Sequence, residues 1–220
     1  LRLFNKNINC QEDVPLVQVK HLYFGTYNHM TTVLRTDKWM QIEPLCQVET
    51  FSLCRVDMAW RMGSYKAMAQ QWGNTLTCLI LNNVTDFHVA DALPLLPQLR
   101  DLRWIGDTCQ ARHISGLANK TLASLRSLII QPSDYEFADV IASMRLPALR
   151  QLVGMLNSGF YHDTCHSPDA LSPRFCCGPF DCDRFLGPFI ALRKSALCPL
   201  LKCVAASEQE ARDWFADRHI

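Results

Sequence analysis

One short pattern recurs along the chain. It consists of an apolar residue, two variable residues, a second apolar residue, one variable residue and a third apolar residue. Copies begin at Val19, Val48, Leu76, Leu99, Leu125, Leu149 and Leu201. The intervals between them are 29, 28, 23, 26, 24 and 52 residues. Self-similarity at such a period means that one supersecondary unit is used repeatedly, because each unit needs its neighbours to bury its apolar face.

The alternation within each copy indicates a short strand with one buried face. We number its positions one to six, with the apolar residues at one, four and six. An α/β leucine-rich-repeat solenoid is typical of this period, because each strand is followed by a return segment that leads to the next strand. We predict a single irregular domain over residues 1–220 with about seven or eight strand-helix repeats. The interval of 52 residues spans two periods, which predicts a disguised copy at 175–180.

A doubly wound α/β domain is the alternative interpretation, because its β-α units have a similar length. Leucine at the first and fourth positions favours the solenoid, because buried parallel strands of other folds are usually continuous Val and Ile runs.

The segments between the strands show helical spacing. A capping box at 133–136 precedes Phe137, Val140, Ile141 and Met144. A second helix is predicted to end at Trp72. A third is predicted to start from an Asp86 cap, to carry Phe87, Ala90 and Leu93, and to be closed by Pro94 or Pro97. Residues 207–220 begin with another capping box and predict a helix that caps the C-terminal end of the stack.

Residues 157–183 break the rhythm and form an irregular insertion rich in cysteine and histidine. Zinc in proteins takes four nitrogen or sulfur ligands, often from two short-spaced pairs. The weak zinc candidates are His162, Cys165, Cys177 and Cys182. The spacings differ from a regular Cys-x2-Cys knuckle, so a loop with free thiols or one local disulfide is the simpler interpretation, and no metal or other cofactor is expected.

The third and fifth positions of each copy are predicted to project onto the concave face, where repeat arrays usually bind proteins. The candidate partner-binding residues there are His21, Tyr23, Ser52, Asp101, Arg103, Ser127 and Gln151. Thr50, Cys78, Ile80, Ile129 and Val153 share this register, whereas Trp104 at a sixth position is expected in the core. Such a mixed face suits a protein or peptide better than a phosphate backbone, which needs clustered Lys and Arg.

Composition excludes several functional classes. The formal net charge is +1 with 20% charged residues, which does not indicate a nucleic-acid or membrane-surface partner. No apolar run reaches the length of a membrane span. Eleven dispersed cysteines, an odd number, favour free thiols and an intracellular location in cytoplasm or nucleus. The common nucleophile, phosphate-loop, dinucleotide and zinc-protease motifs are absent, so we expect no enzymatic activity.

The segments 96–102, 122–128 and 146–152 share the formula Leu-(Pro/Ala)-x-Leu-Arg-x-Leu, and 198–204 opens with Cys-Pro-x-Leu. These segments resemble the irregular leucine-rich repeats of fungal F-box proteins. The resemblance covers roughly residues 15–206 and implies the substrate-binding repeat region of a ubiquitin ligase receptor. In that family an F-box binds the adaptor of a cullin ligase. We find no F-box pattern before Val19, so an adaptor is expected only if an F-box precedes this sequence.

The sequence therefore favours a protein-recognition module over two alternatives. One alternative is a non-catalytic leucine-rich-repeat scaffold unrelated to ubiquitin. The other is a zinc- or thiol-dependent activity in the insertion at 157–183.

Overall fold

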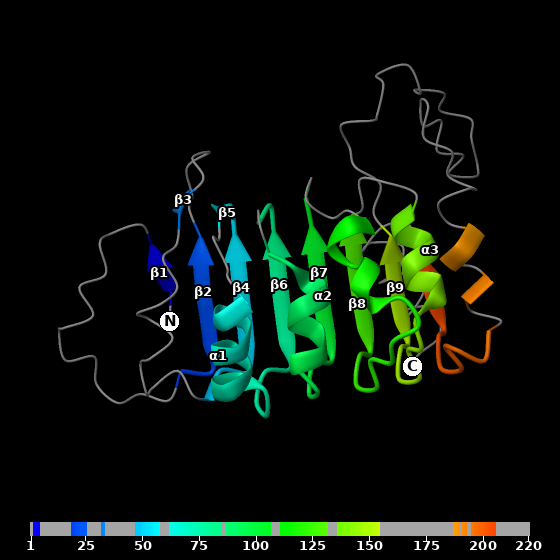
Figure 1. The fold of residues 1–220 in the computed structure, drawn as a ribbon, viewed down its shortest axis with the longest axis horizontal. Coiled ribbons are helices and arrows are strands. Elements are labelled where there is room, and N and C mark those ends of the chain that lie inside the picture. The colour runs from blue at the N-terminus through cyan, green and yellow to red at the C-terminus, as the bar shows by residue number, and fades with distance from the viewer. Residues whose placement is uncertain are drawn as a thin grey trace, which may run out of the picture.

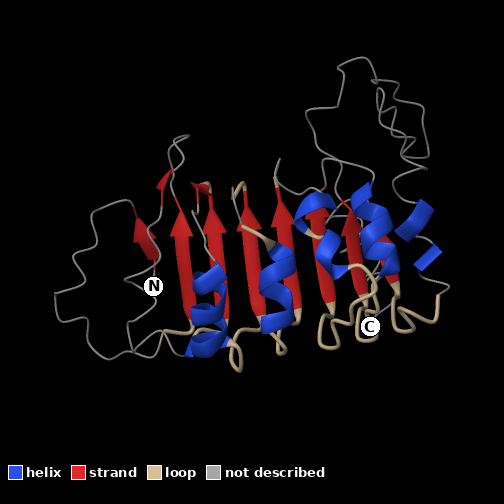
Figure 2. Cartoon of the chain, in the orientation of Figure 1, coloured by secondary structure: helices blue, strands red, loops and turns tan. Residues whose placement is uncertain are grey.

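In the computed structural model, the residues described are 2–4, 19–25, 32–33, 47–57, 62–84, 87–106, 111–131, 136–154, 187–189, 191–192 and 195–205. They form one parallel sheet of eight strands with helices on one side (Figures 1 and 2). The strands are β1 (Arg2–Phe4), β2 (His21–Gly25), β4 (Thr50–Cys54), β6 (Cys78–Asn82), β7 (Asp101–Ile105), β8 (Ser127–Gln131), β9 (Gln151–Gly154) and β10 (Cys203–Ala205). A second sheet pairs β3 (Thr32–Val33) with β5 (Val56–Asp57).

The strands of the large sheet lie side by side in the order in which they occur in the chain. A doubly wound sheet reverses its strand order at a switch point, whereas a stacked array does not. The chain is therefore an α/β protein with a solenoid-like arrangement of strands. The doubly wound alternative is wrong.

The register of the sheet follows the sequence pattern. His21 pairs with Thr50, Thr50 with Cys78, and Cys78 with Asp101, so third positions lie opposite third positions. The same register continues through β8, β9 and β10. The apolar residues at the first, fourth and sixth positions of β2 through β8 are all buried, and they form the centre of the core.

Hydrogen bonds at the start of the strands recur at every step from β2 to β10. Each carbonyl at a second position accepts the N–H groups of the second and third positions of the next strand. The accepting residues are Lys20, Glu49, Thr77, Arg100, Arg126 and Arg150, with distances of 2.7–3.2 Å. This ladder fixes the second positions of neighbouring strands at the spacing of the strands themselves, about 4.8 Å.

A residue with positive φ follows each of three adjacent strands. Arg55, Asn83 and Gly106, which follow β4, β6 and β7, have φ values of 53°, 50° and 124°. The N–H of Asn83 donates to the carbonyl of Ile105 at 2.8 Å. A Cβ on Gly106 would lie 2.9 Å from the Asn83 backbone, so this turn requires glycine for its close approach as well as for its φ.

Helices α1 (Met62–Trp72), α2 (Val89–Ala92) and α3 (Glu136–Ser143) cover one face of the sheet (Figure 1). The predicted apolar side chains Trp72, Phe137, Ile141 and Met144 are buried, which confirms the first two helices. Short 3₁₀ turns at Leu93–Leu95, Ala111–His113 and Ser115–Leu117 complete this layer.

The third predicted helix is shorter than expected, although Pro94, one of its two predicted stops, does close it. Phe87 precedes α2, His88 is the residue at its N-cap, and Leu93 already belongs to the 3₁₀ turn that follows. Pro94 lies inside that turn. Because proline has no N–H to donate, it prevents the α-helical bonding from continuing beyond Ala92.

The C-terminal part of the sheet departs from the regular spacing of the repeat. Strand β9 pairs directly with β10, Gln151 opposite Cys203. The hydrogen-bonding edge of β9 is therefore occupied by β10, and residues 175–180, where a disguised copy is predicted, lie outside the described residues. The 52-residue interval bridges a single strand spacing. Strand β1, which the pattern did not predict, extends the opposite edge of the sheet.

Candidate protein-interaction face

The third and fifth positions of the strands line the face of the sheet opposite the helices, and we call this surface the open face. Its residues on β2 to β9 are His21, Tyr23, Thr50, Ser52, Cys78, Ile80, Asp101, Arg103, Ser127, Ile129, Gln151 and Val153. His21 and Asp101 are exposed, and all the others except Val153 are half-buried. The predicted set is therefore brought together on one surface.

Val153 is the exception, because its side chain is fully buried. Cys203 on the neighbouring strand is buried as well. The expectation that Val153 projects into solvent is wrong. Ile80 and Ile129 at the same fifth position stay half-buried, so the burial of Val153 is due to its surroundings and not to its apolar character alone. The accessible part of the open face therefore lies mainly on β2 to β8.

Trp104 occupies the core as predicted. It is 1% exposed and packs edge-on against Phe137, with 5.6 Å between ring centroids. It also stacks with His113, which in turn stacks with His88. Arg112 donates from Nε to Nε2 of His113 at 3.0 Å. These contacts make His113 part of the packing behind the sheet.

Charge on the open face is concentrated near Asp101. Although Asp101 is exposed as a residue, partial burial of its carboxyl raises the pKa, and the nearby Arg126 and Arg100 oppose this rise. Burial also raises the pKa of the neighbouring Cys78 thiol, and the Asp101 charge raises it further. A thiol with a raised pKa is protonated at neutral pH and is a poor nucleophile. Cys78 can therefore make contacts but is not activated for covalent chemistry.

Three of the described cysteines, Cys54, Cys78 and Cys198, are free thiols. Cys54 directly follows the sixth position of β4 and Cys78 occupies the third position of β6, and both are half-buried on the open face. Cys203 shares the third position with Cys78 but is buried.

The polar neighbours on β8 and β9 are available to a ligand. Ser127 donates to Oε1 of Gln151 at 3.4 Å, a long hydrogen bond between neutral groups. Hydroxyl and amide groups of this kind can both donate and accept, which suits a peptide backbone.

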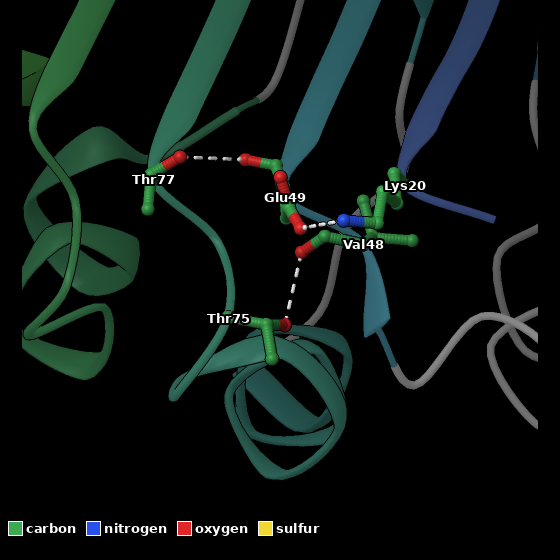
Figure 3. A network of polar contacts seen from close by, with 5 residues as sticks. All are labelled: Lys20, Val48, Glu49, Thr75 and Thr77. Atoms are coloured by element: carbon green, nitrogen blue, oxygen red, sulfur yellow. Dashed lines mark hydrogen bonds and ion pairs between the residues drawn. The ribbon is translucent and has the colours of Figure 1, made fainter. Parts of the chain in front are cut away.

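The edge at which the strands begin differs between its two halves. In Figure 3, Lys20 pairs with Glu49 at 2.9 Å, Thr75 donates to the Val48 carbonyl at 2.9 Å, and Thr77 donates to the Glu49 carbonyl at 3.2 Å. This half is closed by internal contacts. It joins β2, β4 and β6 to the end of α1.

The other half of the edge carries charges that the sequence analysis did not single out. The second positions of β7 to β10 are Arg100, Arg126, Arg150 and Lys202, and all four are exposed. We call these residues the basic row. The signal was present in the sequence, because the arginine belongs to the repeated formula, but only the third and fifth positions were considered.

A hollow of about 170 Å³ lies where the turns before β7 and β8 meet. Leu93, Leu96 and Leu122 are among its lining residues. The lining contains no titratable side chain, so this hollow can hold an apolar group but offers no acid–base chemistry.

The zinc candidates His162, Cys165, Cys177 and Cys182, the insertion at 157–183 and the predicted capping helix at 207–220 lie outside the described residues. Within the described residues, no three His, Cys, Asp or Glu side chains are grouped so as to hold a metal ion. No helix in the same part of the chain is long and apolar enough to cross a bilayer.

Comparison with known proteins supports the fold alone. No protein-family model matches the chain, and no curated protein matches it. A crystal structure of a protein from Bacteroides fragilis is similar, with a TM-score of 0.51 and 14% sequence identity. The match covers 83% of this chain and 51% of that one, so it spans about half the length of the bacterial protein. At this identity the two proteins share an α/β architecture, and the likeness does not extend to function.

Proposed function

We propose that this chain is a protein-recognition module of the leucine-rich-repeat class, which binds a partner on the open face. The observation that carries the proposal is the asymmetry of the sheet. Helices cover one face, and half-exposed polar, charged and apolar side chains occupy the other over successive strands. A flat array that mixes such groups resembles the composition of protein interfaces.

Within that surface, Tyr23 and Arg103 are residue types that often contribute most to binding energy. Ile80 and Ile129 are half-buried and lie on either side of Arg103 across the strands. A partner that covers them removes apolar surface from water while its polar groups meet Asp101 and Ser127.

A display selection of random peptides on the immobilised chain tests this proposal. The selected peptides are then measured on the double variant Asp101→Lys/Arg103→Glu, which reverses two adjacent charges at the centre of the open face. The matched control reverses two exposed charges away from it, Lys66→Glu and Glu136→Lys. We expect the open-face variant to lose binding and the control to keep it. Equal binding to both variants would show that recognition occurs elsewhere.

The finer proposal is that the repeats form the substrate-binding region of an F-box-type ubiquitin ligase receptor within an intracellular protein. The repeated Leu-(Pro/Ala)-x-Leu-Arg-x-Leu formula supports it, and the free thiols among the described cysteines support the location. Affinity capture with the full-length parent protein tests it. Recovery of adaptor and cullin subunits is expected. Their absence, with peptide recognition retained, would leave an interaction scaffold unrelated to ubiquitin.

A further inference from the structure

The basic row is an unusual concentration of charge in a chain whose formal net charge is only +1. Arg100, Arg126, Arg150 and Lys202 stand at the same position of four consecutive strands. The backbone ladder holds them in order, with the N–H of Arg126 donating to the carbonyl of Arg100 at 2.7 Å and that of Arg150 to Arg126 at 2.8 Å. Four like charges are thereby kept in a line about 14 Å long, since strands are about 4.8 Å apart.

Within the described part of the chain, no carboxylate lies within ion-pair distance of this line. Among the residues that the structure describes, the ion pair within 4.0 Å is that of Lys20 with Glu49, at the other half of the same edge. Asp101 is the acidic residue on β7 to β10, and it lies near Arg100 and Arg126 at one end of the row. Arg150 and Lys202 have no carboxylate neighbour on these strands.

We propose that the basic row binds an acidic peptide segment of the partner, with its carboxylates on the row and its backbone and remaining side chains on the adjoining open face. This inference specifies the partner chemistry of the recognition surface proposed above and rests on that proposal. A segment of about five extended residues is long enough to follow the row. Arginine binds carboxylates in a planar, two-pronged geometry, which suits a row composed mainly of arginine.

The neighbouring positions favour a peptide over a nucleic acid. Single-stranded nucleic acids are held by aromatic side chains on which bases stack, combined with cations. The open-face positions of β7 to β9 carry no aromatic residue, and Trp104 is buried on the other side. They offer instead Ser127 and Gln151, whose groups match peptide amides.

The test measures binding of a labelled glutamate-rich peptide by fluorescence anisotropy at low and moderate salt. Its glutamine counterpart and a single-stranded oligothymidylate serve as comparison ligands. The row variant is Arg100→Gln/Arg126→Gln/Arg150→Gln. The matched control, Lys66→Gln/Lys120→Gln/Arg145→Gln, removes the same charge from exposed positions outside the row. Urea unfolding establishes that both variants are folded.

We expect the row variant to weaken binding of the glutamate peptide about tenfold or more, because each exposed ion pair contributes about two- to threefold. The control is expected to change it less than about twofold, and higher salt is expected to weaken wild-type binding. The glutamine peptide should bind poorly to all three proteins.

Three results would overturn the inference. The wild type fails to bind the glutamate peptide, or both triple variants lose binding equally, or the oligothymidylate binds more tightly than the peptide and depends on the row. The display-selected peptides separate this failure from that of the proposed function. If these peptides lose binding to the open-face variant but bind the row variant as tightly as the wild type, the recognition proposal stands and the acidic-peptide inference fails. If they bind the open-face variant as tightly as the wild type as well, the recognition proposal itself fails.

Discussion

An unneutralised basic row should cost the free chain stability, and this cost can be measured at Arg150. Arg150 lies between Arg126 and Lys202 in the ladder, so it has two like-charged neighbours. At about 4.8 Å and a dielectric constant near 80, each pair repels by about 0.9 kcal/mol before screening. At 0.1 M salt, where the Debye length is about 10 Å, the two pairs together cost ~1 kcal/mol.

The substitution Arg150→Gln is therefore expected to raise the free energy of unfolding by up to ~1 kcal/mol at 0.1 M salt, or about 2–4 °C in Tm. The gain should grow to about 1.5 kcal/mol at 10 mM salt and fall to about 0.3 kcal/mol at 1 M. These values are upper bounds, because the flexible side chains can spread apart. Arg100→Gln at the end of the row should gain less, since Arg100 has one such neighbour and lies near Asp101.

Urea unfolding followed by tryptophan fluorescence measures this effect, because urea is uncharged and the ionic strength can be set independently. Buried Trp72 and Trp104 provide the signal. Lys66→Gln, on exposed α1 surface, is the control and should be nearly neutral. If Arg150→Gln destabilises the chain at low salt, or if its effect does not depend on salt, the row is already neutralised and the reasoning is refuted.

Three further predictions test the fold and its electrostatics by the same unfolding assay. Gly106→Ala should lower the free energy of unfolding by about 2–4 kcal/mol, because the φ of 124° and the tight surroundings of Gly106 exclude a Cβ. At Gly116 an added Cβ would lie 3.4 Å from its nearest neighbour, so Gly116→Ala should change this free energy by no more than about 0.5 kcal/mol. Equal effects of the two substitutions would contradict the turn geometry. Leu102→Ala, in the core, should lower the free energy of unfolding by about 2–5 kcal/mol, and Ile80→Ala, on the open face, should lower it by less than about 1.5 kcal/mol. The reverse order would mean that the two faces of the sheet are assigned wrongly. Partial burial raises the pKa of Asp101, so the folded state binds the proton of this carboxyl more tightly than the unfolded state does. Asp101→Asn should therefore increase the free energy of unfolding at neutral pH, and the gain should vanish below about pH 4, where the carboxyl is protonated in both states. A loss of stability at neutral pH would show that the arginine neighbours of Asp101 outweigh its burial.

The strand faces and the register could be predicted from the sequence because the side-chain period of a strand is two. A leucine at a fourth position, such as Leu79, must then face the core of the array. The residue that pairs with it on the adjacent strand must also be at a fourth position. Two helices could be predicted for a similar reason, since Phe137 and Ile141 recur at helical spacing. Local periodicity is sufficient for these features.

The features that were missed depend on distant partners or on packing that a local period does not report. The pairing of β9 with β10 joins segments about 50 residues apart, and no local period reports which edges meet. The late start of α2 at Val89 is of this kind, because Phe87 is buried although it lies outside the helix. The burial of Val153 depends on its surroundings, which the strand register alone does not specify.

The basic row shows how a stacked array converts a local motif into a surface. A single arginine after a leucine is unremarkable, but in-register stacking places each copy about 4.8 Å from the last and turns the motif into a line of charge. Composition conceals this, because acidic residues elsewhere bring the net charge to +1. The basic row ends at β7. The second position of the next strand, β6, is the uncharged Thr77, and on β4 and β2 Glu49 is already paired with Lys20. An acidic segment therefore gains ion pairs with the basic row on the side of β7 to β10, and its charged part lies there. The surface of β2 to β6 is left for the less charged remainder of the partner.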